Sequence, residues 1–173
     1  CSSDLDATLV AIFKKFGVET IFNTNNSITV SKSTIHEVQP IICNLNSSPD
    51  IAQTIAVTCF GLGLECHLTG LHTLKIKETD RLEALQKELS KLGATVSITA
   101  DSLTLAPSMR MNTEVKIATY NDHRMAMAFA PLALKTTIII ENAQVVSKSY
   151  PSFWKDLKSI GFLVSEISEK HNI

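Results

Sequence analysis

One short pattern occurs three times in this 173-residue chain: an amphipathic helix, a glycine, and then β-branched residues typical of a strand. The glycines are Gly17, Gly93 and Gly161, which lie 76 and 68 residues apart. Each stands where the end of a helix needs a left-handed residue, and a lysine in the preceding turn suits the helix dipole. The pattern predicts a strand after each glycine, with further strands at 27–30 and 102–105.

A second element recurs with a similar period. Asp50 opens an almost wholly apolar helix at 51–62, and Asp122, 72 residues later, opens another at 125–134. Apolar residues on all sides of both helices predict that they are buried. Pro131 should kink or shorten the second helix.

A period near 70 residues is too long for a solenoid repeat. Three copies of a mixed unit instead predict one α+β domain with pseudo-threefold symmetry, in which buried parallel helices lie inside and amphipathic helices and sheets lie outside. No linker divides residues 1–173, and the first copy looks incomplete at its start. Because Cys1 falls directly in an apparent helix, we expect the chain to be part of something longer.

Composition limits the classes of partner. The formal net charge of -1 gives no bulk attraction to nucleic acid or to a membrane surface. No apolar run reaches the ~18 residues that a membrane span needs. The four cysteines form no C-x-x-C pair and have no histidine at metal-ligand spacing, which predicts reduced, packed thiols, a cytoplasmic location and no metal or other cofactor.

Cations gather at predicted helix starts, where they cost ~0.3–1 kcal/mol each unless an anion offsets them. Asp80, with Glu83 three residues later, forms a plausible capping box, so Lys75, Lys77 and Arg81 crowd the start of that helix. The helix should turn four leucines inward: Leu82, Leu85, Leu89 and Leu92.

Two more clusters have the same character. His123 and Arg124 follow Asp122, and Lys148 precedes Pro151, a residue suited to the first position of a helix. Backbone N–H groups with arginine and lysine are what phosphate and carboxylate ligands require. Any one cluster alone is better explained as solvated surface with a local salt bridge, but three in analogous places favour a shared anion site.

For two carboxylates, Glu78 and Asp50, the residues alone allow a structural role as well as a functional one. Glu78 lies between Lys77 and Arg81, where it is either a structural counter-ion or a general acid whose pKa its neighbours tune. Asp50 taken alone fits a simple helix N-cap best.

Three stretches together resemble the 5-enolpyruvylshikimate-3-phosphate synthases (3-phosphoshikimate 1-carboxyvinyltransferases). Residues 75–82, KIKETDRL, resemble the R-x-K-E-[TS]-D-R signature of that family, and residues 120–127, YNDHRMAM, resemble its second signature. Residues 146–153, VSKSYPSF, resemble its closing [ST]-K-[ST]-[FY]-P stretch. Order and spacing agree, and the match runs from about Phe13 to Phe162.

The resemblance implies a fold of two similar lobes, each built from three β-α-β-α-β-β units. Residues 1–173 would be the C-terminal lobe, without the N-terminal lobe and without the start of the first repeat. It also implies a transferase of the shikimate pathway of aromatic amino acid biosynthesis. Phosphoenolpyruvate and shikimate 3-phosphate would give the enolpyruvyl ether and phosphate, and the lobe alone would be inactive.

The resemblance also implies residue roles. Asp50 would take the proton from the attacking hydroxyl, and Glu78 would protonate the methylene carbon of phosphoenolpyruvate. The residues that would bind the two substrates are Lys77, Arg81, His123, Arg124 and Lys148.

The sequence departs from the family pattern in places. Lys75 replaces the usual first arginine, and Thr73 stands where some members have an asparagine that touches the sugar acid. The segments of the other lobe that carry its substrate-binding Lys-Ser pair and Ser-Ser-Gln run are not found here. Two alternatives remain: the related transferase that acts on a nucleotide-linked amino sugar, which lacks the K-E-T-D-R run, and a phosphate-binding module without turnover.

Overall fold

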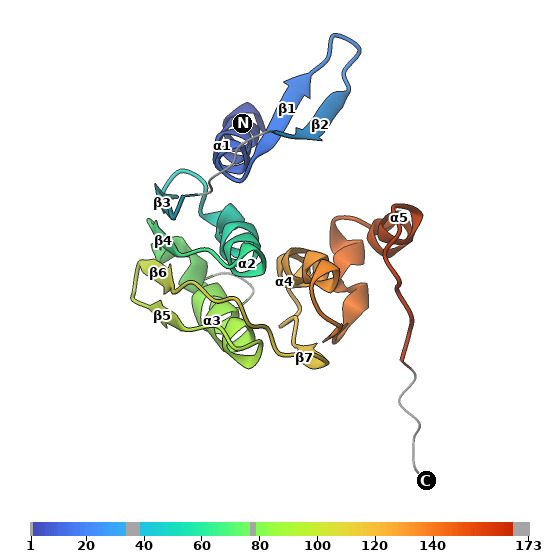
Figure 1. The fold of residues 1–173 in the computed structure, drawn as a ribbon. Coiled ribbons are helices and arrows are strands. Elements are labelled where there is room, and N and C mark those ends of the chain that lie inside the picture. The colour runs from blue at the N-terminus through green and yellow to red at the C-terminus, as the bar shows by residue number, and fades with distance from the viewer. Residues whose placement is uncertain (1, 34–38, 77–78, 168–173) are drawn as a thin grey trace.

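The computed structural model of the chain describes residues 2–33, 39–76 and 79–167. Its elements form three consecutive groups that lie at the top, left and right of Figure 1. The first group is a helix and an antiparallel hairpin: α1 (Ser2–Lys15), β1 (Val18–Phe22) and β2 (Ile28–Lys32).

The second group has the element order β-α-β-α-β-β. Its strands form one sheet in the order β3-β4-β6-β5, where β3 and β4 are parallel and the other pairs are antiparallel. A short 3-10 helix precedes each α-helix. The elements are β3 (Ile41–Asn44), η1 (Pro49–Ile51), α2 (Ala52–Leu62), β4 (Cys66–Thr69), η2 (His72–Ile76), α3 (Arg81–Lys91), β5 (Val96–Ile98) and β6 (Ser102–Leu105).

The third group repeats the first four elements of that order. Its strands β7 and β8 are parallel, and α4 lies between them in the sequence, as α2 lies between the parallel strands β3 and β4. The elements are β7 (Val115–Ile117), α4 (His123–Phe129), η3 (Ala130–Leu134), β8 (Ile138–Ile140), η4 (Ala143–Lys148) and α5 (Phe153–Ser159). The recurrence of a mixed helix-and-strand unit is therefore confirmed for the second and third groups, as far as these four elements go.

The third glycine is not followed by a strand, contrary to the prediction. Gly161 ends α5 with φ +102, but residues 162–167 form no strand. In the other two groups the strand after the glycine pairs with the next strand, β1 with β2 and β5 with β6. Within the part of the chain that the structure describes, residues 162–167 have no such partner, so no hydrogen-bond ladder forms.

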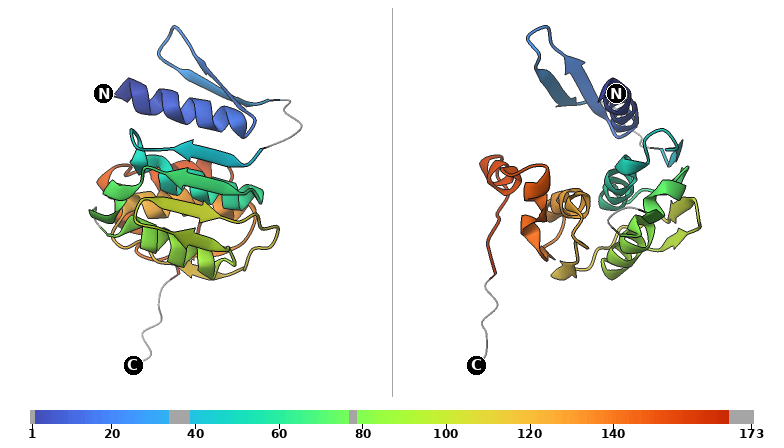
Figure 2. Two further views of the ribbon diagram at one scale, coloured as in Figure 1. Left: turned by 90° about the vertical axis from the view of Figure 1, so that its left-hand side faces the viewer. Right: turned by 180° about the vertical axis from the view of Figure 1, so that it is seen from behind.

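The buried helices α2 and α4 lie side by side at the centre (Figure 1). The helices are seen nearly end-on in Figure 1 and from the side in the left view of Figure 2, so their axes run in roughly one direction. Pro131 shortens the second buried segment, because α4 ends at Phe129 and a 3-10 helix follows. The four leucines of the α3 segment are fully buried, as predicted.

The β1–β2 hairpin leaves large apolar side chains open to solvent. Phe22 is 60% exposed and Val30 is 64% exposed. The counterpart of β2 in the second group, β6, pairs with β4 on its other side. Among the described residues the first group has no strand equivalent to β4.

The thiols match the expectation of reduced, packed cysteines where they are described. Cys59 and Cys66 are buried, Cys43 is half-buried, and all three are free. Along the described ranges, no helix combines the length and the apolar character that crossing a bilayer demands.

Candidate active site

Two aspartates at equivalent places in the repeat converge on one arginine. Asp50 lies in η1 before α2, and Asp122 precedes α4, so each follows the first strand of a parallel pair. Arg81, the first residue of α3, places its Nη1 2.8 Å from Asp50 Oδ1 and its Nε 2.6 Å from Asp122 Oδ2. The starts of three helices are thus joined by one charged network.

Burial differs sharply within this network. The side chains of Arg81 and Asp122 are 2% and 0% exposed, whereas that of Asp50 is 32% exposed. A buried charge is tolerated only when paired, and breaking such a pair is costly. Arg81 is therefore a fixed internal cation, and Asp50 is the carboxylate that solvent can reach.

Asp122 is the N-cap of α4, as the sequence predicted. Its Oδ1 accepts a hydrogen bond from the backbone N–H of Arg124 at 2.9 Å. Gln53, which is 1% exposed, donates to the other oxygen of the same carboxylate at 3.3 Å. The sequence reasoning missed Gln53, although an amide inside an otherwise apolar helix was the available signal.

Asp50 is not a simple N-cap, so that default interpretation is wrong. The N-cap position of η1 is Ser48, and Asp50 lies inside the 3-10 turn. Its side chain faces Arg81 on one oxygen and Arg124 on the other, where Nη2 lies 3.5 Å from Oδ2. Arg124 also donates from Nη1 to the Asp50 carbonyl at 3.3 Å.

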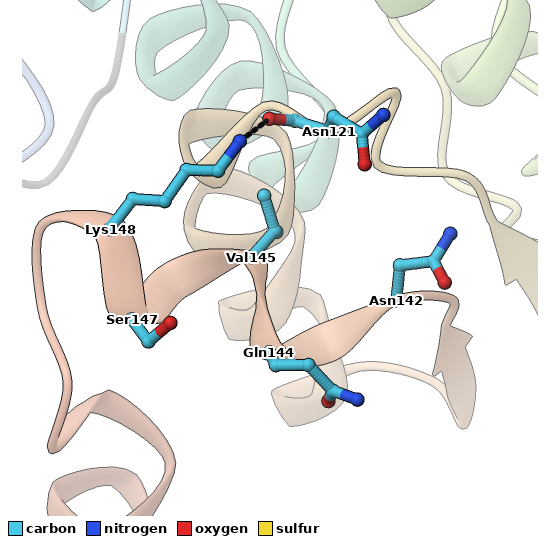
Figure 3. A pocket seen from close by; sticks show the side chains of 6 residues that line it. All are labelled: Asn121, Asn142, Gln144, Val145, Ser147 and Lys148. Carbon is cyan, nitrogen blue, oxygen red and sulfur yellow. Dashed lines mark hydrogen bonds between the residues drawn. The ribbon is translucent and has the colours of Figure 1, made fainter.

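Among the described residues of the site, Arg124 and Lys148 are the cations that solvent reaches. The Arg124 side chain is 40% exposed, and Lys148 is exposed. Lys148 does not lie at a helix start, contrary to the prediction: it is the last residue of η4, and Pro151 precedes α5, which begins at Phe153. Its ammonium instead reaches the start of α4, donating to the Asn121 carbonyl at 3.0 Å (Figure 3).

An open pocket of about 350 Å³ lies beside this contact (Figure 3). Amide and hydroxyl side chains line the pocket together with the lysine, which suits an anionic or polyhydroxylated ligand. The lining residues are Asn121, Asn142, Gln144, Val145, Ser147 and Lys148.

The turn before α4 has an unusual backbone. Tyr120 and Asn121 have φ of +53 and +57, and the Asp122 N–H donates to the Thr119 carbonyl at 2.8 Å. Positive φ at both central residues is the requirement of a type I′ turn. Each non-glycine residue in this region costs roughly 1–2 kcal/mol.

The remaining predicted residues fall in three places. Asp80 is the N-cap of α3, accepting from the N–H groups of Leu82 and Glu83. His123 is the half-buried first residue of α4. Lys77 and Glu78 lie outside the described residues.

The described charges favour an anionic ligand. Arg81 and Arg124 face the carboxylates Asp50 and Asp122, and Lys148 binds a backbone carbonyl nearby, so the described charged groups of the site, His123 aside, sum to +1. In residues 2–33, 39–76 and 79–167 there is no group of three or more metal-binding side chains.

The fold defines a class. The chain superimposes on the EPSP synthase of Acinetobacter baumannii with a TM-score of 0.66 at 20% identity, covering 87% of this chain and 38% of that one. It also superimposes on the enolpyruvyl transferase NikO of Streptomyces tendae with a TM-score of 0.62 at 14% identity, covering 91% and 35% of the two chains. This is the enolpyruvyl transferase fold, which confirms the predicted fold class.

The sequence defines the family. The profile of EPSP synthase (3-phosphoshikimate 1-carboxyvinyltransferase) matches residues 2–157, so the chain belongs to that family. The 3-phosphoshikimate 1-carboxyvinyltransferase of Bacteroides fragilis strain YCH46 is 43% identical over 160 residues, covering 91% of this chain and 38% of the relative. That of Clostridium novyi is 36% identical over 169 residues, covering 94% and 37%. The chain therefore spans well under half the length of these relatives.

Proposed function

We propose that this chain is the C-terminal lobe of a 3-phosphoshikimate 1-carboxyvinyltransferase and supplies half of its active site. The observation that carries the proposal is the shared Asp50 carboxylate, held between a buried Arg81 and an open Arg124. Prearranged cations and helix N-termini suit a reaction of two polyanionic substrates, because they stabilise charge without reorganising.

The proposed reaction transfers the enolpyruvyl group of phosphoenolpyruvate to the 5-hydroxyl of shikimate 3-phosphate. The hydroxyl oxygen bonds to C2 of phosphoenolpyruvate while a proton adds to its methylene carbon, which gives a tetrahedral intermediate. The bond from C2 to the phosphate oxygen then breaks, and the methyl carbon loses a proton. We assign the hydroxyl proton to Asp50 and the methylene proton to Glu78.

Solvent exposure decides which substrate-binding role we assign to each cation. Arg124 and Lys148 reach solvent, so they would hold the phosphate and carboxylate of phosphoenolpyruvate, with His123 beside them. Arg81 is 2% exposed and already binds two carboxylates, so it would reach a ligand only if Asp50 moved. While both of its ion pairs are intact, Arg81 would instead hold the Asp50 carboxylate in position. Lys77 would bind shikimate 3-phosphate.

The main proposed partner is a second lobe of the same polypeptide. Apolar side chains on the β1–β2 hairpin are exposed, and large apolar patches are usually covered by another part of the protein. This supports a second lobe that packs against this one. The free thiols support a reducing compartment such as the cytoplasm. Neither nucleic acid nor a membrane is a proposed partner.

The test compares this chain with the complete enzyme, meaning the full polypeptide to which we propose the lobe belongs. Phosphate release from phosphoenolpyruvate plus shikimate 3-phosphate is the assay. We expect turnover by the complete enzyme only when both substrates are present, and none by this chain alone. No turnover by the complete enzyme would refute the proposal.

A matched pair of arginine variants tests the site. Arg124→Met should lower kcat/KM about a hundredfold or more, since it removes a charge from the anion site. Arg110→Met, at an exposed arginine away from the network, should leave the rate within about twofold of the wild type. Equal effects of the two changes would contradict the assignment.

A second candidate function is a phosphate-binding module without turnover. The observation in its favour is that the chain covers only 38% of the Bacteroides fragilis relative. Calorimetric binding of phosphoenolpyruvate by a polypeptide that never releases phosphate would support it over the transferase.

A further inference from the structure

Glu88 is a fully buried carboxylate that the proposed chemistry does not use. It lies on α3 at 0% exposure. One oxygen accepts from Lys91 Nζ at 2.6 Å and from the Ala118 N–H at 3.1 Å. The other accepts from the Tyr120 hydroxyl at 2.7 Å. Glu88 therefore ties α3 to the segment that leads into α4.

Tyr120, which donates the hydrogen bond to Glu88, is the first central residue of the type I′ turn. Asparagine adopts left-handed backbone readily, and Asn121 suits its position in the turn, but tyrosine has no such preference. A strained conformation persists only where the surroundings hold it. The hydroxyl of Tyr120 is held by Glu88 at the far end of its ring, so the side chain fixes the strained residue from outside the turn.

The turn positions two groups of the site, the Asn121 carbonyl and the Asp122 side chain. The Asn121 carbonyl accepts the hydrogen bond from Lys148. The next residue, Asp122, binds Arg81 and caps α4. A change in the turn would therefore move a binding lysine and the cap that orients the first turn of α4 together.

We propose that Glu88 is a positioning residue that acts through Tyr120 to set the anion-binding geometry of Lys148 and Arg124. The inference rests on the proposed function of the site. Burial and the nearby carboxylate also raise the pKa of Tyr120, so the phenol keeps its proton and remains a donor at neutral pH.

The test uses the complete enzyme and separates the two substrates. Tyr120→Phe keeps the ring and removes the hydroxyl, and it should raise KM for phosphoenolpyruvate about tenfold or more, because small displacements of positioned groups are costly. KM for shikimate 3-phosphate should stay within about twofold. Glu88→Gln should act in the same direction, and it carries the test if Tyr120→Phe does not fold.

The matched control lies on the same helix. Gln86 donates to the Val96 carbonyl at 3.0 Å and does not touch the turn. Gln86→Met also removes a hydrogen bond from α3, and it should leave both KM values within about twofold of the wild type.

Each outcome of these KM measurements either supports the positioning role of Glu88 or overturns it. A selective rise in KM for phosphoenolpyruvate supports the inference. Unchanged KM values in an active enzyme, or a loss confined to thermal stability and active fraction, would overturn it and leave the proposed function standing. An inactive wild-type complete enzyme would refute the proposed function, and the inference would fall with it.

Discussion

Asp80 and Asp122 are both helix N-caps, but only Asp122 is fully buried and paired with Arg81, which predicts different costs for removing them. Asp80 caps α3 from a partly exposed position, whereas Asp122 caps α4 and also pairs with the buried Arg81 at 2.6 Å. Losing a cap costs about 1 kcal/mol. Removing Asp122 also takes away one of the two carboxylates that pair with the buried Arg81, and because Asp50 still contacts Arg81 at 2.8 Å, we expect a further cost of roughly 2–3 kcal/mol, below the roughly 3–5 kcal/mol of a buried charge left wholly unpaired.

We therefore expect Asp80→Ala to lower the free energy of unfolding of this chain by about 1 kcal/mol, and Asp122→Ala to lower it by about 3–4 kcal/mol. Asp122→Asn should fall between them, because asparagine still caps the helix but removes the charge facing Arg81. Urea unfolding followed by far-UV circular dichroism measures all three. Costs for the two alanine variants that agree within about 1 kcal/mol would refute the buried ion pair as the source of stability.

Three further predictions concern single groups. In a Tyr150→Phe variant, Tyr120 is the remaining tyrosine, and its raised pKa means that it should ionise above the ordinary value of about 10. Unfolded tyrosine then loses its proton first, so the free energy of unfolding should fall as pH rises above about 10; an ordinary ultraviolet titration of the native chain would contradict this. Gly70→Ala should destabilise the chain more than Gly161→Ala, because a Cβ at Gly70 would lie 2.5 Å from a backbone nitrogen and one at Gly161 meets nothing within 4 Å. Urea unfolding measures both glycine variants, and equal costs would count against the packing around Gly70. Burial raises the pKa of the Cys43 thiol, so iodoacetamide should alkylate it more slowly in the native chain than in urea; equal rates by mass mapping would exclude that environment.

The parts of the fold that follow local rules could be predicted from the sequence. Gly17 and Gly93 end helices because only a left-handed residue closes those turns, and both have positive φ. Asp80 and Asp122 are N-caps because a short carboxylate before a helix satisfies free N–H groups. These features depend on neighbours in sequence, which the sequence displays directly.

The parts that depend on distant partners could not be predicted in the same way. Asp50 looks like a cap, but two arginines 31 and 74 residues away determine where its side chain lies. Lys148 looks like a residue at a helix start, yet it acts across 27 residues on the Asn121 carbonyl. The missing strand after Gly161 depends on a pairing partner, which no local pattern reveals.

The most direct measurement is a crystal structure of the complete enzyme with phosphoenolpyruvate and shikimate 3-phosphate bound. The proposed site predicts a single phosphoenolpyruvate whose anionic oxygens lie within hydrogen-bonding distance of both Arg124 and Lys148, next to Asp50. A phosphoenolpyruvate bound elsewhere, or one that touches neither cation, would contradict a shared anion site at these helix starts.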